Sequence, residues 1–299
     1  MTLPIVYHEA YEIDIGPHVF PTRKYRLVRQ RLVTAGAVED RQLIRTEPAD
    51  DRAIERVHTA EYVRKIRTAG FTAGELLRLE VPFSAELRDA SWLCAGGSTR
   101  TARLALDHGV ALHLGGGFHH AFPDHGEGFC LINDVAVAVE TLREEGAIRR
   151  ALVVDCDVHH GNGTAAVFAR EPAVFTFSMH QEANYPAWKP PSDLDLGLAD
   201  GTGDEAYLAL LDAHLPAIVD HHRPELAFYL AGADPYEHDQ LGGLSLTLPG
   251  LLRRDELVIG ALRAGGAAVA VVLAGGYATR PEDTVEIHCN TARAAAAAA

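Results

Sequence analysis

Short apolar runs alternate with longer amphipathic stretches along the chain, a pattern typical of a mostly parallel sheet covered by helices on both faces. The runs that predict strands are Ile5–Tyr7, Val110–Leu114, Ala151–Asp155, Ala173–Ser178, Leu226–Leu230 and Ala268–Leu273. The stretches that predict helices are Arg23–Ala35, Glu61–Ala69, Ala85–Asp107, Asn133–Glu145, Asp204–Asp220 and Leu251–Ala264. We therefore predict an α/β fold.

Nothing in the sequence divides the chain, because it contains neither a low-complexity linker nor an internal repeat. We predict a single domain over residues 1–299. Its C-terminal alanine run, Ala294–Ala299, either extends a helix or frays at the end of the chain.

Residues suited to metal binding and catalysis follow four of the predicted strands. The four segments are 116–120 (GGFHH), 155–163 (DCDVHHGNG), 232–234 (GAD) and 275–277 (GGY). In open α/β sheets ligands bind at the carboxyl ends of the strands. Asp157 and His159 stand two positions apart after a buried strand, so in extended chain their side chains point the same way. With one further Asp they make a three-ligand site that keeps a position open, as catalytic zinc does.

Composition and charge narrow the function classes. The chain of 299 residues is 47% hydrophobic and 23% charged and has a net charge of −14, which disfavours nucleic acid as a partner. The same field favours cationic substrates such as lysine-bearing peptides or polyamines, unless it serves only solubility. No apolar run approaches the roughly 20 residues of a membrane helix, and the start of the chain predicts no signal peptide. Four scattered cysteines fit a reducing cytoplasm.

The longer motifs resemble those of the zinc-dependent histone deacetylase family, which has the arginase–deacetylase fold. The resemblance extends from residues 18–21 (HVFP) and 57–62 (VHTAEY) through 128–134 (GFCLIND) and 239–245 (DQLGGLS) to the 275–277 segment. The run from Asp239 to Leu257 is most similar to class IV deacetylases and their bacterial relatives. The resemblance implies active-site segments at 115–134, 151–163, 178–186, 230–243 and 273–278.

The resemblance assigns zinc, one ion per chain, to Asp157, His159 and Asp234. Iron(II) also suits two carboxylates and an imidazole. Taken singly, Asp157 is equally well explained as a solvated strand end and His159 as a hydrogen-bonded core residue. The resemblance also implies a structural monovalent cation, often potassium, beside Asp155, Asp157, His159 and Ser178.

Amide hydrolysis needs a base for water and an acid for the leaving amine, so a tandem histidine pair is suited to it. The resemblance makes His120 the general base and His119 its electrostatic partner, oriented by Asp155. Asn162 stands where class I deacetylases have Asp, so it orients His120 but raises the pKa of that ring less than an anion would. Tyr277 is expected to stabilise the oxyanion.

Gly128, Phe129, Tyr185 and Gly275 are candidate substrate-binding residues, with Phe129 and Tyr185 as walls of an acyl-lysine tunnel. Tyr185 fits the core equally well. The glycines at 115–117 either leave room for a longer acyl chain or only allow the turn.

We therefore expect a cytoplasmic zinc hydrolase that removes acetyl or longer acyl groups from N-acyl amines, with acyl-lysine proteins as substrates. An acetylpolyamine amidohydrolase and a weakly catalytic acyl-ligand binding protein are the alternatives. No membrane or nucleic-acid partner is expected. A two-manganese ureohydrolase is disfavoured, because Gly161 and Gly232 stand where those enzymes carry aspartates.

Overall fold

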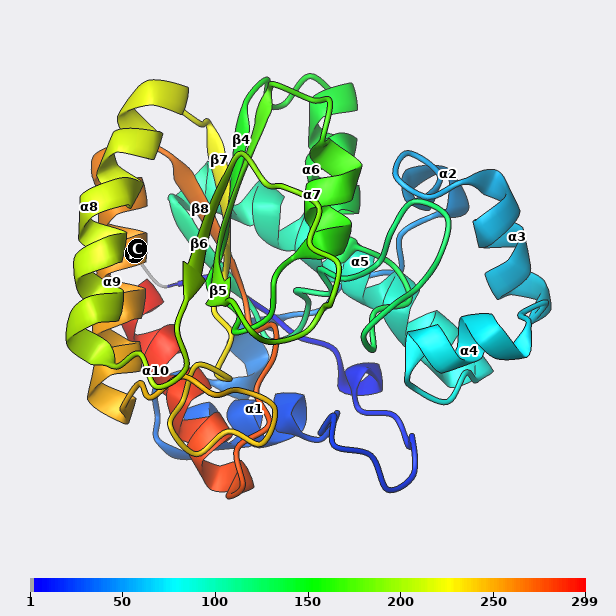
Figure 1. Cartoon of the computed structure of the whole chain (residues 1–299), viewed down its shortest axis with the longest axis horizontal. Helices are drawn as coiled ribbons and strands as arrows, with labels where there is room; N and C mark the ends of the chain where they lie inside the picture. The colour runs from blue at the N-terminus through cyan, green and yellow to red at the C-terminus, as the bar shows by residue number, and fades with distance from the viewer. Residues whose placement is uncertain (1–2) are drawn as a thin grey trace.

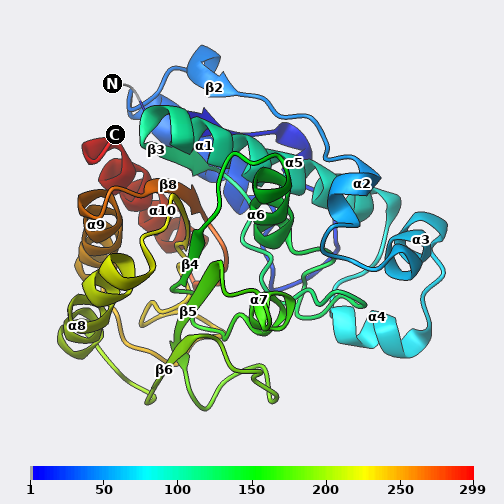
Figure 2. The same ribbon diagram turned by 90° about the horizontal axis from the view of Figure 1, so that it is seen from above.

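The computed structural model describes residues 3–299. Met1 and Thr2, with which the expectation about a signal peptide begins, lie outside the described residues. An eight-stranded sheet with every neighbouring pair parallel forms the centre of this described chain (Figures 1 and 2). The strands are β1 Ile5–Val6, β2 Leu43–Ile44, β3 Val110–His113, β4 Ala151–Asp155, β5 Val174–Gln181, β6 Leu194–Leu198, β7 Leu226–Leu230 and β8 Ala268–Val272.

Helices cover both faces of the sheet. Figure 2 shows α5, α6 and α7 on one side and α8, α9 and α10 on the other, with α1 packed beside α10. The α-helices are α1 Lys24–Thr34, α2 Asp51–Ile54, α3 Ala60–Thr68, α4 Ala73–Leu79, α5 Ala85–His108, α6 Asp134–Glu144, α7 Asn162–Phe168, α8 Asp204–His222, α9 Leu248–Ala264 and α10 Pro281–Ala297. The predicted α/β fold, a parallel sheet between two helical layers, is confirmed.

Local capping sets several of the helix boundaries. Ser84 begins α5, because its side chain accepts the backbone N–H of Leu87 at 3.1 Å. Thr247 caps α9 in the same way through Gly250. The helix α9 therefore begins at Leu248, three residues before the predicted start at Leu251.

The elements that the apolar pattern did not predict are short or bury polar residues. The strands β2 and β6 lie at the two edges of the sheet, where fewer side chains are buried. The helices α2, α4 and α7 have four to seven residues. The longer α10 buries Thr284, His288 and Asn290, which are not apolar. The alanine run extends this helix to Ala297, the first of the two alternatives.

The strand order is β2-β1-β3-β8-β7-β4-β5-β6. The four strands that precede the predicted active-site segments, β3, β8, β7 and β4, are therefore consecutive neighbours at the centre of the sheet. Because all strands are parallel, their carboxyl ends meet at one edge. Segments separated by more than 150 positions in the chain are thus brought together there.

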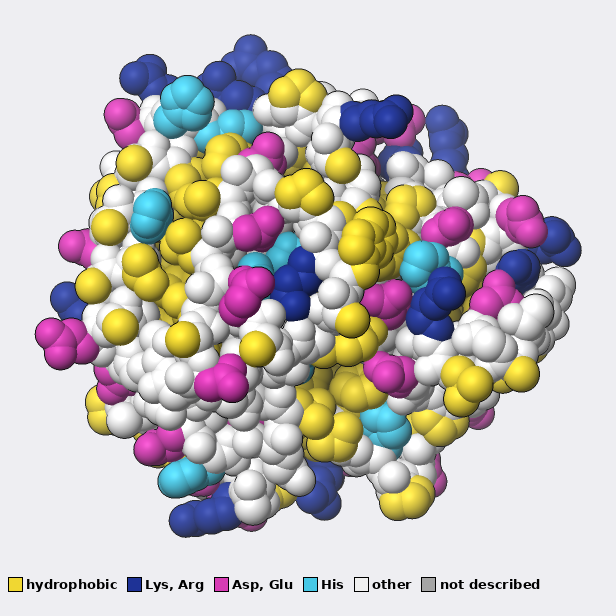
Figure 3. Space-filling view, viewed as in Figure 1, with side chains coloured by type: hydrophobic (Ala, Val, Ile, Leu, Met, Phe, Trp, Pro, Cys, Tyr) yellow, Lys and Arg dark blue, Asp and Glu magenta, His cyan; other side chains and the backbone are white. Residues whose placement is uncertain are grey.

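Two features of the structure concern the expected partners: the distribution of charge on the surface, and the length and hydrophobicity of the helices. On the face drawn in Figure 3, acidic and basic side chains are interspersed with hydrophobic and uncharged ones. None of the helices within residues 3–299 is both long enough and apolar enough to cross a membrane.

Candidate active site and metal centre

Asp157, His159 and Asp234 meet beyond the ends of β4 and β7. One potential ligand atom from each lies within 4.8 Å of the others, and all three residues are buried. Nδ1 of His159 is 3.0 Å from Oδ1 of Asp157 and 3.5 Å from Oδ2 of Asp234. Backbone N–H groups hold the other carboxylate oxygens, with Val158 donating to Asp234 at 2.9 Å and Gly275 to Asp157 at 2.8 Å. The structure thus gathers the three predicted metal ligands.

Two properties of this cluster fit a cation. Oδ2 of Asp234 is buried and has no hydrogen-bond partner within the described part of the chain. Burial and the Asp157 carboxylate raise the pKa of Asp234 to about 7. Burial alone would lower the pKa of His159, but the carboxylates of Asp157 and Asp234 raise it to about 10. Without a metal the residues therefore hold protons in a strongly negative environment, where a divalent ion would be stabilised.

The same carboxylates leave no room for a side chain at Gly275. A Cβ atom there would lie 2.0 Å from Oδ2 of Asp234 and 2.5 Å from Oδ2 of Asp157. The predicted role of Gly275 in substrate binding is untested, but its absent side chain is what allows the two aspartates to approach the backbone.

His119 and His120 form a hydrogen-bonded pair next to the cluster. Their Nε2 atoms lie 3.1 Å apart, and Nδ1 of His119 is 2.6 Å from Oδ2 of Asp155. Burial opposes protonation of His119, but the carboxylates of Asp155 and Asp157 outweigh it and raise the pKa of His119 to about 9. Burial and the neighbouring His119 lower the pKa of His120 well below its usual value. At neutral pH one ring is therefore cationic and the other neutral.

Asn162 fixes the orientation of His120. Its amide oxygen lies 2.6 Å from Nδ1 of His120, and its amide nitrogen donates to Oε1 of Glu127 at 2.6 Å. Because the nitrogen must donate to the carboxylate, the oxygen accepts the N–H of His120, whose Nε2 then carries the lone pair. Glu127 was not predicted as a site residue, since nothing in the local sequence relates it to a residue 35 positions away.

Tyr277 lies at the opposite wall of the site. Its ring centroid is 6.3 Å from that of His159 and 6.1 Å from that of Phe129. Burial and the carboxylates of Asp157 and Asp234 raise the pKa of Tyr277 well above its usual value, so the hydroxyl stays protonated and can donate. Asp239, which lies in the predicted active-site segment 230–243 but was given no role of its own, accepts the backbone N–H of Tyr277 at 2.7 Å and holds it in place.

Aromatic rings surround the approach to the histidine pair. Phe129 stacks on Phe20 with centroids 6.0 Å apart, and the Tyr185 ring lies edge-on to His120 at 5.1 Å. Both predicted wall residues are only partly buried. Phe129 has a φ of 68°, a left-handed conformation unusual for an aromatic residue. A Cβ atom at Gly128 would meet both His120 and Tyr185 at 2.7–3.0 Å, so this glycine lets the wall approach the base.

The glycines at 115–117 allow the turn to pack closely against its neighbours. A Cβ atom at Gly116 would lie 2.6 Å from Asp134, and one at Gly117 would lie 2.7 Å from the backbone of Ala274. Asp134 in turn accepts the backbone N–H of Phe118 at 2.8 Å, which fixes the loop that carries the histidine pair. The cavity beside this loop has a volume of about 20 Å³.

The residues expected beside a monovalent cation also lie close together. The backbone N–H of Asp157 donates to Oδ1 of Asp155 at 3.1 Å. Ser178 faces Asp155 on the neighbouring strand β5 through the register of the sheet and is buried. Binding of potassium stays a prediction.

Carboxylates and imidazoles at the strand ends of a parallel sheet define a class of metal-dependent hydrolases. A model of the histone deacetylase domain matches residues 18–292. The chain therefore belongs to the histone deacetylase family.

Relatives and a solved structure agree with this assignment. The chain is 42% identical to an uncharacterized protein of Picosynechococcus sp. over 99% of both chains. It is 31% identical to a probable deacetylase of Archaeoglobus fulgidus, over 93% of this chain and 82% of the relative. The crystal structure of the HDA15 HD domain superposes with a TM-score of 0.83 at 24% identity, over 99% of this chain and 90% of that one. The likeness to that structure shows that the fold is shared.

Proposed function

We propose that this member of the family is a zinc-dependent deacylase that hydrolyses the amide bond of acylated lysine side chains. One observation carries the proposal. A neutral imidazole, His120, and a cationic one, His119, lie side by side next to a buried cluster of two carboxylates and a third imidazole. Hydrolysis of an amide requires such a base and acid within reach of one carbonyl group.

Zinc held by Asp157, His159 and Asp234 would lower the pKa of water and polarise the acyl oxygen. Nε2 of His120, which carries the lone pair of that ring, accepts the proton of the water that attacks the carbonyl carbon. The hydroxyl of Tyr277 donates to the oxygen that becomes negative. When the C–N bond breaks, one of the two histidines returns a proton to the amine. The products are a free lysine amine and a carboxylate.

The shape of the site supports short acyl groups. The walls formed by Phe129 and Tyr185 suit the apolar stem of lysine. The cavity of about 20 Å³ beside the histidine pair holds about one water molecule, so a long acyl chain would enter it only if the surrounding side chains moved. We therefore expect acetyl-lysine to be turned over faster than octanoyl-lysine or myristoyl-lysine.

An acetylpolyamine is the second candidate substrate, favoured by two acidic residues near the aromatic wall. Burial and the nearby Glu127 raise the pKa of Glu80, so these two carboxylates influence each other. The backbone carbonyl oxygen of Glu80 accepts a hydrogen bond from Nε2 of His18. The ring centroid of His18 lies 4.9 Å from that of Phe129. Carboxylates placed there would attract the cationic tail of a polyamine.

The test is deacylation by the zinc-loaded protein of matched acetyl-, octanoyl- and myristoyl-lysine peptides and of N-acetylated polyamines. Asp157→Ala serves as the blank. Metal-dependent turnover of the acetyl-lysine peptide above all other substrates would support the proposal. Faster turnover of polyamines would favour the second candidate. No turnover above the blank, with zinc bound to the wild type, would favour a binding protein.

A further inference from the structure

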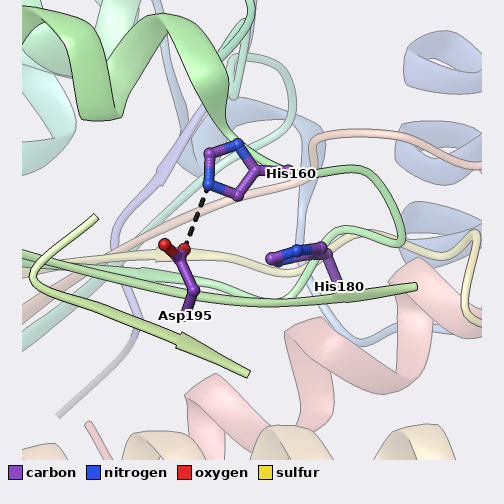
Figure 4. Close-up of side chains that lie close together, drawn as sticks. All are labelled: His160, His180 and Asp195. Carbon is purple, nitrogen blue, oxygen red and sulfur yellow. Dashed lines mark hydrogen bonds and ion pairs between the residues drawn. The ribbon is translucent and has the colours of Figure 1, made fainter. Parts of the chain in front are cut away.

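A second group of potential metal ligands lies outside the site described above. His160, His180 and Asp195 each offer one ligand atom, and these atoms lie within 4.8 Å of one another (Figure 4). His160 follows the predicted zinc ligand His159 in the chain, but its ring contacts Asp195 on the edge strand β6 instead. The two histidine rings are almost perpendicular, with centroids 4.7 Å apart.

The sheet explains why the three residues meet. His180 lies two positions after Ser178 in β5, so both side chains project from the same face. Asp195 is the register partner of Ser178 on β6, and Gly197, the partner of His180, carries no side chain. The loop after β4 then brings His160 over this face.

Hydrogen bonds hold the side chains of both strand residues in place. Nδ1 of His180 lies 3.0 Å from the hydroxyl of Ser178. Oδ2 of Asp195 accepts the backbone N–H of Ser192 at 2.9 Å, which leaves Oδ1 next to Nε2 of His160 at 3.0 Å. Ligands of bound metals are commonly oriented by such outer hydrogen bonds.

The two nitrogen atoms of His160 have different surroundings. Nε2 faces the cluster and lies 3.0 Å from Oδ1 of Asp195, whereas Nδ1 is buried and has no hydrogen-bond partner among residues 3–299. Lys189 is near His180, but its ammonium group donates to the carbonyls of Asn184 and Pro186.

We infer that His160, His180 and Asp195 form a second metal site, which takes zinc or another transition-metal ion of similar preference. Two imidazoles and one carboxylate are a common zinc ligand set, whereas potassium prefers oxygen ligands alone. Tetrahedral zinc with bonds of about 2.0–2.1 Å separates its ligand atoms by about 3.3 Å. This separation lies between the 3.0 Å contact of His160 with Asp195 and the 4.8 Å within which all three ligand atoms lie. The ion would join the two outer strands β5 and β6 to the loop that carries Asp157 and His159.

The test is a count of metal ions bound to the full chain, after dialysis of the metal-free protein against Co²⁺ or Zn²⁺ alone. The wild type should bind two ions per chain. Asp157→Ala should retain one and Asp195→Asn should retain one, while the double variant should retain none. His221→Gln, which removes an exposed histidine of α8, should retain both.

A second readout guards against variants that fail to fold. In the Asp157→Ala background, Co²⁺ should give the visible absorption of a four- or five-coordinate ion and raise the melting temperature. Asp195→Asn and His180→Gln should each remove both effects, with a melting temperature in the absence of metal close to that of their background. A single ion per chain in the wild type, or a second ion that survives both substitutions, would overturn the proposal.

Discussion

The side-chain amide of Asn162 donates a hydrogen bond to the carboxylate of Glu127 across 2.6 Å. The other end of the same amide accepts from His120, so the chain places a negative charge one hydrogen bond away from the proposed base. Although Asn162 is neutral, His120 is therefore still linked to a carboxylate, that of Glu127, through the Asn162 amide. The anion lies on Glu127, whose side chain is 17% exposed.

Asn162→Asp should raise the pKa of His120, because a carboxylate in direct contact stabilises the imidazolium more than an amide does. The acidic limb of the profile of kcat/KM against pH should move to higher pH. The variant should also lose about 1–3 kcal/mol of unfolding free energy, since two acceptors then face each other at a buried position. Urea unfolding and pH–rate profiles measure the two effects. Adding Glu127→Gln should restore the stability, and a limb that stays in place would contradict this role of Asn162.

Tyr277→Phe should lower kcat by about 100- to 1,000-fold, because it removes a donor to the oxyanion and nothing else. Zinc content should be unchanged, since the three predicted ligands Asp157, His159 and Asp234 all remain. Steady-state kinetics on the acetyl-lysine peptide measure the loss of kcat, and metal analysis measures the zinc content. Near-full activity would exclude Tyr277 from the reaction.

Gly275→Ala should weaken metal binding by at least tenfold, because the new methyl group would displace the carboxylates of Asp234 and Asp157. Gly260 offers a matched control, since it is exposed on α9 and a Cβ atom there would have nothing within 4 Å. Gly260→Ala should keep the metal and gain about 0.5–1 kcal/mol of stability. The measurement is competition with a coloured chelator, and equal affinities for the two variants would refute the expectation.

The protein should lose stability as the pH falls below about 6.5. Burial lowers the pKa of His58 to about 4 and that of His113 to about 3, so both rings are neutral in the folded state. The unfolded chain binds protons at these residues from about pH 6.5 downward, whereas the folded chain does not. Each ring should therefore cost about 2 kcal/mol of unfolding free energy at pH 5.

The raised pKa of Asp234, about 7, offsets part of this loss, because below pH 7 the folded chain binds a proton there that the unfolded chain does not. The shifts of His119 and His159 do not change the slope between pH 5 and 6.5. Their raised pKa values stabilise the fold fully below pH 6.5 and lose their effect only as the pH rises toward about 9 and 10. Urea unfolding at pH 5 and 7 checks the prediction. His113→Gln should flatten the acidic slope, and equal stability of the wild type at both values would contradict it.

The apolar pattern predicted the centre of the fold because each central strand is buried on both faces and so carries an uninterrupted apolar run. The strand β4 is an example, with all five residues buried. The edge strand β6 has exposed and buried residues in alternation and includes Asp195 and Gly197, so no such run marks it. Edge strands and short helices depend on contacts from distant segments, which the local pattern does not contain.

The site residues also divide into those that a local pattern predicts and those that depend on contacts with distant segments. Asp157 and His159 stand next to each other on one strand end, so their spacing carries geometric information. Glu127, Asp134 and Asp239 act by accepting hydrogen bonds from residues 16–38 positions away. Their partners follow only from the folded arrangement. The pattern likewise did not show that a Cβ atom at Gly116 would meet Asp134 or that one at Gly117 would meet Ala274.

The position of β8 in the sheet governs when the site can exist. This strand is the last in the chain, yet it lies between β3 and β7. The strands made earlier can pair only as two separate groups, β2-β1-β3 and β7-β4-β5-β6, which β8 joins. Before it inserts, the histidine pair and the three predicted metal ligands belong to unconnected halves. A ribosome-bound chain that lacks residues 268–277 therefore lacks both the strand that joins the two groups and the predicted site residues Gly275 and Tyr277.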